Sequence, residues 1–226
     1  MGRPQRLTLG MAIAAVLCLL TPTGALATTA GGKVMPAGAQ PHGWSLARMT
    51  GALALFTTGG NDPANYPDTP FQVLYVDPST VNVVPVNGGL QTVGSNTFTV
   101  PVGTSFFVPL FNVDDSPPVL GTWPANHQEA IGYFFGASQI GARGFEITID
   151  GQSASIGSAY LAGPVGTPPL LDGGGTHILT LGAFLHPLTP GTHTVSIAGG
   201  VFGEQLLSTF GISFLTENDT YRVTVG

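Results

Sequence analysis

The chain has 226 residues, of which only six are Lys or Arg and twelve are Asp or Glu, and its formal net charge is −6. Because the basic residues are few and unclustered, the composition argues against nucleic acid or an anionic membrane surface as a partner. The 33 glycines and 19 prolines approach the composition of disordered chains, but 13 Phe and frequent Val, Ile and Leu favour a folded, turn-rich β protein.

Residues 1–27 have the pattern of a secretory signal peptide. Arg3 and Arg6 precede an uncharged apolar stretch from Leu7 to Leu20, and the small-x-small sequence Ala25-Leu26-Ala27 forms a cleavage signal. The apolar stretch is shorter than the roughly 20 residues of a membrane-spanning helix, so an uncleaved anchor is the less favoured alternative. We therefore expect a secreted, periplasmic or extracellular protein with no membrane span after signal cleavage.

Removal of this segment would also change the composition of the chain. Cys18, the only cysteine, would be lost, so the mature protein would have neither a disulfide nor a thiolate metal site. Its four basic and twelve acidic residues would give a net charge of −8. Residues 28–43 are small, polar and without periodicity, and we expect a flexible leader there, followed by one domain over residues 44–226.

Two segments of this domain have helical spacing. In Trp44–Phe56, apolar residues recur every three or four positions and Ser45 could cap the first turn, which predicts a short helix packed on an open sheet face. Ala125–Phe135 has a similar apolar face ahead of Gly136, although its aromatic run would also suit a strand. We expect a helix in both places.

The remaining segments predict strands separated by Gly/Pro turns. Nine or ten short strands of this kind favour a mainly β fold, a single jelly-roll-like β-sandwich with one or two short helices. The expected strands are Phe71–Val76, Val81–Val86, Thr97–Pro101, Ser105–Val113, Gly144–Ile149, Ser155–Leu161, Thr176–Leu185, Thr192–Ala198, and a terminal hairpin of residues 210–214 and 221–225 around Glu217-Asn218-Asp219.

The segment Phe106–Phe111 is apolar on both alternating faces. Phe107, Pro109 and Phe111 are expected to point to one side, and Phe106, Val108 and Leu110 to the other. A strand that is apolar on both sides must be covered on both sides, so we place it inside a sandwich or beneath a helix.

Four segments carry a family resemblance. They are, in order, Thr99–Asn112 (TVPVGTSFFVPLFN), Ile149-Asp150-Gly151, Leu188–Ile197 (LTPGTHTVSI) and Tyr221–Val225 (YRVTV). Together they resemble a family of small secreted bacterial β-sandwich proteins of unestablished function, over roughly Phe71 to the end, although this chain lacks cysteines near the first segment. The resemblance implies a secreted β-sandwich and supplies no catalytic residue.

Acidic side chains at the end of the central strand suggest two kinds of site. Asp114 and Asp115, joined by Asp62, Asp68 or Asn112, could supply oxygen ligands for Ca²⁺, although neither EF-hand nor RTX spacing is present. The favoured alternative is a strand-end turn with solvated carboxylates, and we expect no other cofactor.

A second reading of the acidic loop adds His127 and Glu129, which follow it closely. With Asp114 or Asp115 they could form an acid–base site, because carboxylate pairs cleave glycosidic bonds when held a few ångströms apart. The favoured alternative is a solvated helix start, where Glu129 would interact with the helix dipole.

Aromatic residues beside the Gly/Pro loops suggest a third kind of site. Tyr66 and Trp123 could stack on a sugar while Asp114 accepts hydrogen bonds from its hydroxyls, although packing is the commoner use of such rings. Together these features predict a secreted non-catalytic protein that binds carbohydrate or another cell-envelope component, or that is structural at the cell surface. The alternative is an extracellular polysaccharide-acting hydrolase or lyase that uses the loop carboxylates.

Overall fold

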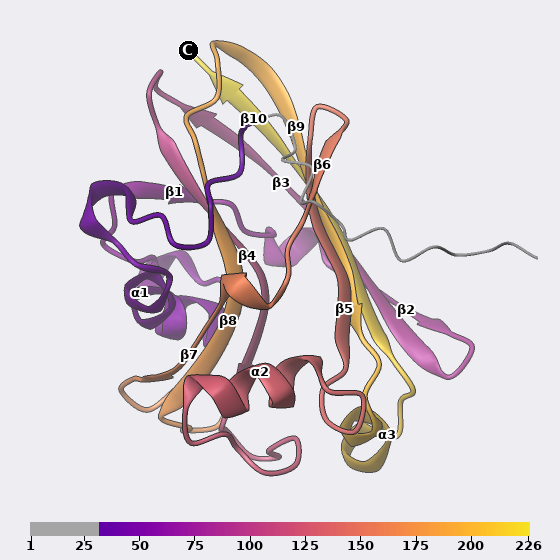
Figure 1. Cartoon of the computed structure of the whole chain (residues 1–226). Helices are drawn as coiled ribbons and strands as arrows, with labels where there is room; N and C mark the ends of the chain where they lie inside the picture. Colours follow the sequence, from indigo (N-terminus) through magenta and orange to yellow (C-terminus); the bar gives the residue numbers. More distant parts are fainter. Residues whose placement is uncertain (1–31) are drawn as a thin grey trace, which may run out of the picture.

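The computed structural model describes residues 32–226, which form a mainly β fold of two facing sheets and three α-helices (Figure 1). The strand order is β1-β4-β8-β7 in the four-stranded sheet and β2-β3-β10-β9-β5-β6 in the six-stranded sheet, which confirms the predicted fold class. The strands are β1 (Phe71–Val73), β2 (Asn82–Val86), β3 (Gly89–Val100), β4 (Ser105–Asp114), β5 (Ala142–Ile149), β6 (Gln152–Ser155), β7 (Leu161–Gly166), β8 (His177–Leu185), β9 (Gly191–Val201) and β10 (Leu215–Val225), and the helices are α1 (Leu46–Thr58), α2 (His127–Phe135) and α3 (Glu204–Phe210).

The topology differs from a regular jelly roll in the direction of two strand pairs. β1 runs parallel to β4, and β10 runs parallel to β3 along its whole length. The other pairs are antiparallel. A jelly roll is an antiparallel arrangement, so the fold is a sandwich of mixed sheets.

The central strand β4 is covered on both faces, as predicted. Phe106, Val108 and Leu110 belong to the core between the sheets, whereas Phe107 packs on the other side beneath α1. A β-bulge between Pro109 and Phe111 then shifts the register against β8. Phe111 therefore packs on the inter-sheet core and not on the face of Phe107, which corrects the predicted alternation.

The helix α1 forms where its apolar spacing predicts it and lies on the outer face of the four-stranded sheet (Figure 1). The hydroxyl of Ser45 accepts a hydrogen bond from the backbone N–H of Arg48 at 3.1 Å and caps the first turn. Met49, Leu53 and Phe56 are buried against the sheet. The predicted role of this helix as a cover for an open sheet face is confirmed.

The helices α2 and α3 lie at one end of the sandwich, where the two sheets spread apart (Figure 1). In α2, Ala130 and Phe134 are fully buried in the main core, so the helical alternative for this aromatic run is confirmed. α3 was not expected from the sequence, and its Leu206 is buried in the same core.

The segment expected to be a flexible leader, residues 28–43, is partly a component of the sandwich. Val34 forms a β-bridge with Leu185, and the side chain of Met35 is 7% exposed. The Nζ atom of Lys33 lies 2.8 Å from Oδ2 of Asp150. The domain therefore begins before Trp44, while residues 28–31 and the expected signal peptide, residues 1–27, lie outside the described residues. Within residues 32–226 no helix is both long enough and apolar enough to cross a bilayer.

The predicted terminal hairpin is wrong. Residues 215–225 form the single strand β10, which lies between β3 and β9, and the chain before it forms α3. The tripeptide Glu217-Asn218-Asp219 is the expected turn of that hairpin, yet all three residues lie within this strand. Pairing with two neighbouring strands outweighs the local turn signal.

Candidate functional site

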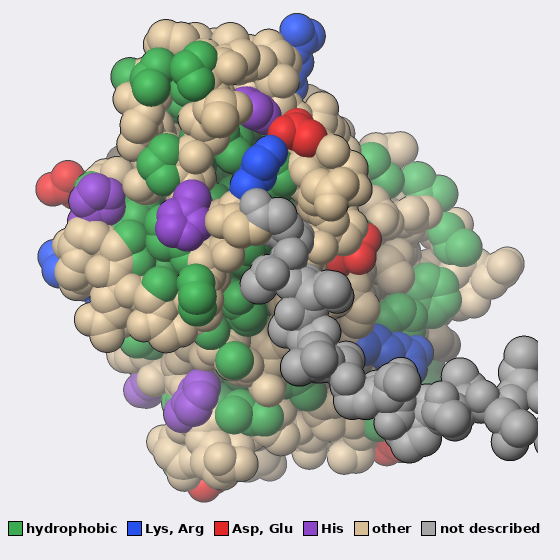
Figure 2. Space-filling model, turned by 45° about the horizontal axis from the view of Figure 1, so that its top comes forward, with side chains coloured by type: hydrophobic (Ala, Val, Ile, Leu, Met, Phe, Trp, Pro, Cys, Tyr) green, Lys and Arg blue, Asp and Glu red, His purple; other side chains and the backbone are tan. Residues whose placement is uncertain are grey.

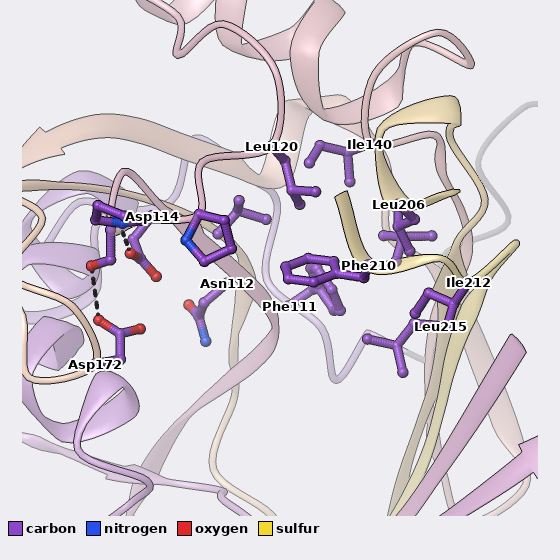
Figure 3. Close-up of a pocket in the computed structure, with 15 residues that line it drawn as sticks. Phe111, Asn112, Asp114, Leu120, Ile140, Asp172, Leu206, Phe210, Ile212 and Leu215 are labelled. Carbon is purple, nitrogen blue, oxygen red and sulfur yellow. Dashed lines mark hydrogen bonds between the residues drawn. The ribbon is translucent and has the colours of Figure 1, made fainter. Parts of the chain in front are cut away.

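A cavity of about 320 Å³ lies at the helix-covered end of the sandwich, between the end of β4 and α3 (Figure 3). One part of its wall is apolar, and the other carries acidic and amide side chains. The apolar part is formed by Phe111, Val113, Leu120, Ile140, Val201, Leu206, Phe210, Ile212 and Leu215, and the polar part by Asn112, Asp114, Ser116 and Asp172.

The apolar wall is assembled from segments that are distant in the sequence. Leu206 and Phe210 are four residues apart in α3, so they share one side of the helix. The helix ends at Gly211, whose φ of 70° is the left-handed conformation that glycine adopts easily. The chain can then turn back, so that Ile212 and Leu215 also reach the cavity (Figure 3).

The polar end is organised around Ser116. Its backbone N–H donates to Oδ1 of Asp114 at 2.8 Å, and its hydroxyl donates to Oδ1 of Asp172 at 2.9 Å (Figure 3). Burial raises the pKa of Asp114, and the nearby carboxylate of Asp172 adds to the rise, whereas the hydrogen bonds from Ser116 oppose it. Asp114 therefore retains its proton at a higher pH than an ordinary aspartate does.

Asp115 does not face the same cavity as Asp114. Its Oδ1 accepts hydrogen bonds from the backbone N–H groups of Thr176, at 2.6 Å, and His177, at 2.8 Å, while its Oδ2 lies 2.9 Å from Nδ1 of His177. Burial opposes ionisation, but these hydrogen bonds outweigh it and lower the pKa of Asp115. The two carboxyl groups therefore have different roles: Asp114 lines the cavity, and Asp115 binds the backbone at the start of β8.

The residues expected to hold Ca²⁺ are not gathered around one point. Asp62 accepts from the backbone N–H of Ala64 at 2.9 Å, Asp68 is exposed, and Oδ1 of Asn112 accepts from the hydroxyl of Thr180 at 2.7 Å. Across residues 32–226 no three His, Cys, Asp or Glu side chains are grouped as metal ligands.

The expected acid–base residues are also separated. Oδ1 of the N-cap residue Asn126 accepts from the backbone N–H of Glu129 at 3.0 Å, and Oε2 of Glu129 accepts from the backbone N–H of Ala125, the residue before the cap, at 2.9 Å. His127 places Nδ1 3.1 Å from the carbonyl oxygen of Gly163 and lines a different cavity from Asp114. These contacts match the helix-start alternative.

Both aromatic residues proposed as sugar platforms are used in packing. Trp123 lies edge-on to Tyr133, with ring centroids 5.6 Å apart, and its Nε1 is buried. The ring of Tyr66 packs on Phe56 at 5.3 Å, and its hydroxyl accepts from the backbone N–H of Val73 at 3.0 Å. Of the sequence-predicted residues, Asp114 and Asn112 line the cavity, and neither ring does.

The comparisons with known proteins give no family for this chain. No family model matches it, and no curated protein matches it. A solved structure described as PbICP-C in complex with falcipain-2 aligns over 70% of this chain and 100% of its own, at 10% identity and a TM-score of 0.24. A likeness at that level supports no conclusion about fold or activity.

Proposed function

We propose that this protein is a secreted, non-catalytic binding protein whose end cavity holds a small amphiphilic component of the cell envelope. The observation that carries the proposal is the division of one cavity wall into a continuous apolar part and an acidic end (Figure 3). Ligand sites are typically apolar hollows of about 300–1,000 Å³ with a few polar groups that fix the orientation of the ligand. The volume of about 320 Å³ suits a small ligand.

The wall chemistry defines both ends of the ligand. Side chains of β4, β9 and α3 would surround an alkyl or ring system, and each buried CH₂ group contributes about 0.8 kcal/mol. The carboxylates of Asp114 and Asp172 accept hydrogen bonds, so the polar end of the ligand should donate them, as a hydroxyl or amide group does. An anionic end would be repelled, which argues against fatty acids.

The charge distribution is consistent with this kind of partner. On the face shown in Figure 2, charged side chains lie singly or in pairs among hydrophobic and uncharged groups. Such a surface suits a small, mostly apolar ligand better than a polyanion. Export rests on the signal-peptide pattern of residues 1–27.

The hydrolase or lyase alternative requires carboxylates that converge on one substrate. Asp114 lines the end cavity, Asp115 is bound to His177 and the N–H of Thr176, and Glu129 is bound to the N–H of Ala125 at the start of α2. A shared two-carboxylate mechanism therefore has less support than binding does.

The test is competition between a fluorescent probe and a series of alcohols. N-phenyl-1-naphthylamine, which is neutral and apolar, should fluoresce on entering the cavity, and 1-alkanols from hexanol upwards should displace it. Each added CH₂ should tighten binding about fourfold until the cavity is full, because about 0.8 kcal/mol corresponds to that ratio. The carboxylate of equal length should compete more weakly.

Two substitutions on α3 make a matched pair for this assay. Phe210 lines the cavity although it is 51% exposed, whereas Leu207 is 57% exposed and does not line it. Phe210→Glu should weaken probe binding, and Leu207→Glu should leave it unchanged. Equal effects of the two substitutions, or alkanol affinities independent of chain length, would contradict the proposal.

A further inference from the structure

A second cavity of about 260 Å³ lies beside the first, along the same strand β4. The two cavities share Phe111 and Asn112, but the second is predominantly polar. Its wall is formed by Thr57 and Asn61 at the end of α1, by Leu74, Tyr75 and Val76 after β1, by residues 109–112 of β4, and by Glu217 and Tyr221 of β10.

One member of a buried carboxyl pair, Glu217, lines this cavity. Asp219 follows two positions later on the inward face of β10, so both side chains project between the sheets. Asp219 is only 3% exposed, and its Oδ2 atom receives no N–H or hydroxyl donor among residues 32–226, while its carboxyl group shares a side-chain hydrogen bond with that of Glu217. Burial raises the pKa of both carboxyl groups, and the proximity of Asp219 raises that of Glu217 further.

The basic residues of the described chain do not compensate this pair. Lys33 is bound to Asp150, Arg48 lies 4.0 Å from the ring of Trp44, and Arg143 lies 4.0 Å from the ring of Phe202. Arg222 lines a separate cavity on the opposite face of β10. Ionisation of buried carboxyl groups without a counter-ion costs free energy, so a positively charged ligand would be stabilised by supplying the missing counter-ion.

The rest of the wall suits a small organic cation with N–H donors. Asn61 donates through Nδ2 to the carbonyl oxygen of Val76 at 3.2 Å, which leaves its Oδ1 as an acceptor. Tyr75 and Tyr221 add hydroxyl oxygens and aromatic rings, which attract cations. The cavity is small, so it fits a ligand of few atoms.

We propose that this second cavity binds the primary ammonium group of a small molecule, with Glu217 as its direct anionic partner and Asp219 hydrogen-bonded to Glu217. An ammonium group donates three hydrogen bonds, and the carboxylate of Glu217, Oδ1 of Asn61 and a tyrosine hydroxyl can accept them. When the cation binds, the carboxyl pair gives up its proton to the buffer and becomes ionised. This site is separate from the proposed amphiphile cavity, because Glu217 and Tyr221 line only the second.

Isothermal titration calorimetry with n-butylammonium chloride at pH 7.5 tests the proposal. We expect saturable binding and a heat that differs between phosphate and Tris buffers, because a proton is released. The titratable groups that line the cavity are Glu217, Tyr75 and Tyr221, and Asp219 is hydrogen-bonded to Glu217. Among residues 32–226, no His, Lys or Arg lines it. n-Butanol, which has no charge, should not bind there.

Three variants distinguish this site from the first cavity. Glu217→Gln, or Asp219→Asn if the first variant does not fold, should weaken butylammonium binding at least about tenfold. Asp114→Asn, which changes a carboxyl group of the first cavity only, should leave it within about twofold. Loss of binding in Asp114→Asn alone, unchanged binding in Glu217→Gln, or displacement of the amine by Ca²⁺ would each overturn the proposal.

Discussion

Replacement of Phe107 by alanine should lower the free energy of unfolding by about 4 kcal/mol. The side chain is 0% exposed and packs with Met49 and Leu53 of α1 and with Phe184 of β8, whose ring centroid lies 5.1 Å away. Removal of a fully buried phenylalanine typically costs about 3–5 kcal/mol. Gly182 lies against the tip of this ring and has no side chain that could fill the space, which favours the upper half of that range.

Equilibrium unfolding in urea measures this loss directly, and thermal unfolding gives a second reading. For a domain of this size, about 4 kcal/mol corresponds to a decrease in Tm of roughly 8–16 °C. The matched control is Val102→Ala in the turn between β3 and β4, where the side chain is 60% exposed and the change should be within about 0.5 kcal/mol. A loss below about 1 kcal/mol in Phe107→Ala would refute the conclusion that α1 seals this face of β4.

Three further substitutions test the electrostatics and the capping. Asp150→Asn should lower Tm at pH 7, because burial is outweighed by hydrogen bonds from Lys33 and His193, which depress the pKa of Asp150. The stability that the ionised Asp150 contributes is present above about pH 4 and declines below it, so a Tm difference as large at pH 3 as at pH 7 would contradict the argument. Glu217→Gln should raise Tm at pH 8, because the raised pKa of Glu217 makes the wild-type protein lose stability as the pH rises above about 4. A variant whose Tm is lower than that of the wild type at pH 8 but not at pH 4 would contradict this expectation. Asn126→Ala should cost about 1 kcal/mol in urea unfolding through loss of the α2 cap, and no change would show that Glu129 maintains the helix start alone.

The parts of the fold that the sequence predicts well are those with a strong local signal. α1 is recognisable because its apolar residues fit the helical period and Ser45 precedes them. β4 is recognisable because Phe106, Phe107 and Val108 leave neither face polar, which requires cover on both sides. Each of these inferences needs only neighbours within about a dozen residues.

The parts that were mispredicted depend on contacts between distant segments. β10 pairs with β3 more than 100 residues earlier, for example Glu217 with Thr92, and this pairing holds Glu217-Asn218-Asp219 extended although the tripeptide resembles a turn. The bulge at Leu110 likewise depends on the register against β8, so alternation alone placed Phe111 on the wrong face.

The residues of the candidate site also differ in how well the sequence predicts them. Asp114 and Asn112 could be identified from the sequence because they end a conspicuous strand. Leu206 and Phe210 could not, because their four-residue spacing is a weak helical signal in a helix of seven residues, and the sequence pattern places Phe210 in a strand of residues 210–214. The acidic pair of the second cavity was hidden by the turn assignment.

Both cavities have one structural cause, which is the incomplete covering of β4. β1 pairs with residues 105–107 of that strand, so within the described part of the chain, residues 32–226, the edge of β4 beyond Phe107 has no neighbouring strand. After β1 the chain crosses to β3 of the other sheet, where the backbone N–H of Asp77 donates to the carbonyl oxygen of Ser95 at 3.0 Å. Space remains beside Phe111 and Asn112, where both cavities meet β4. An uncovered edge is a liability that folded proteins usually remove, and a longer β1 would remove it here. Asp114 and Asp172 line the first cavity and Glu217 lines the second, and carboxyl groups placed beside an uncovered edge favour a binding role for this edge of the sandwich over a purely structural one.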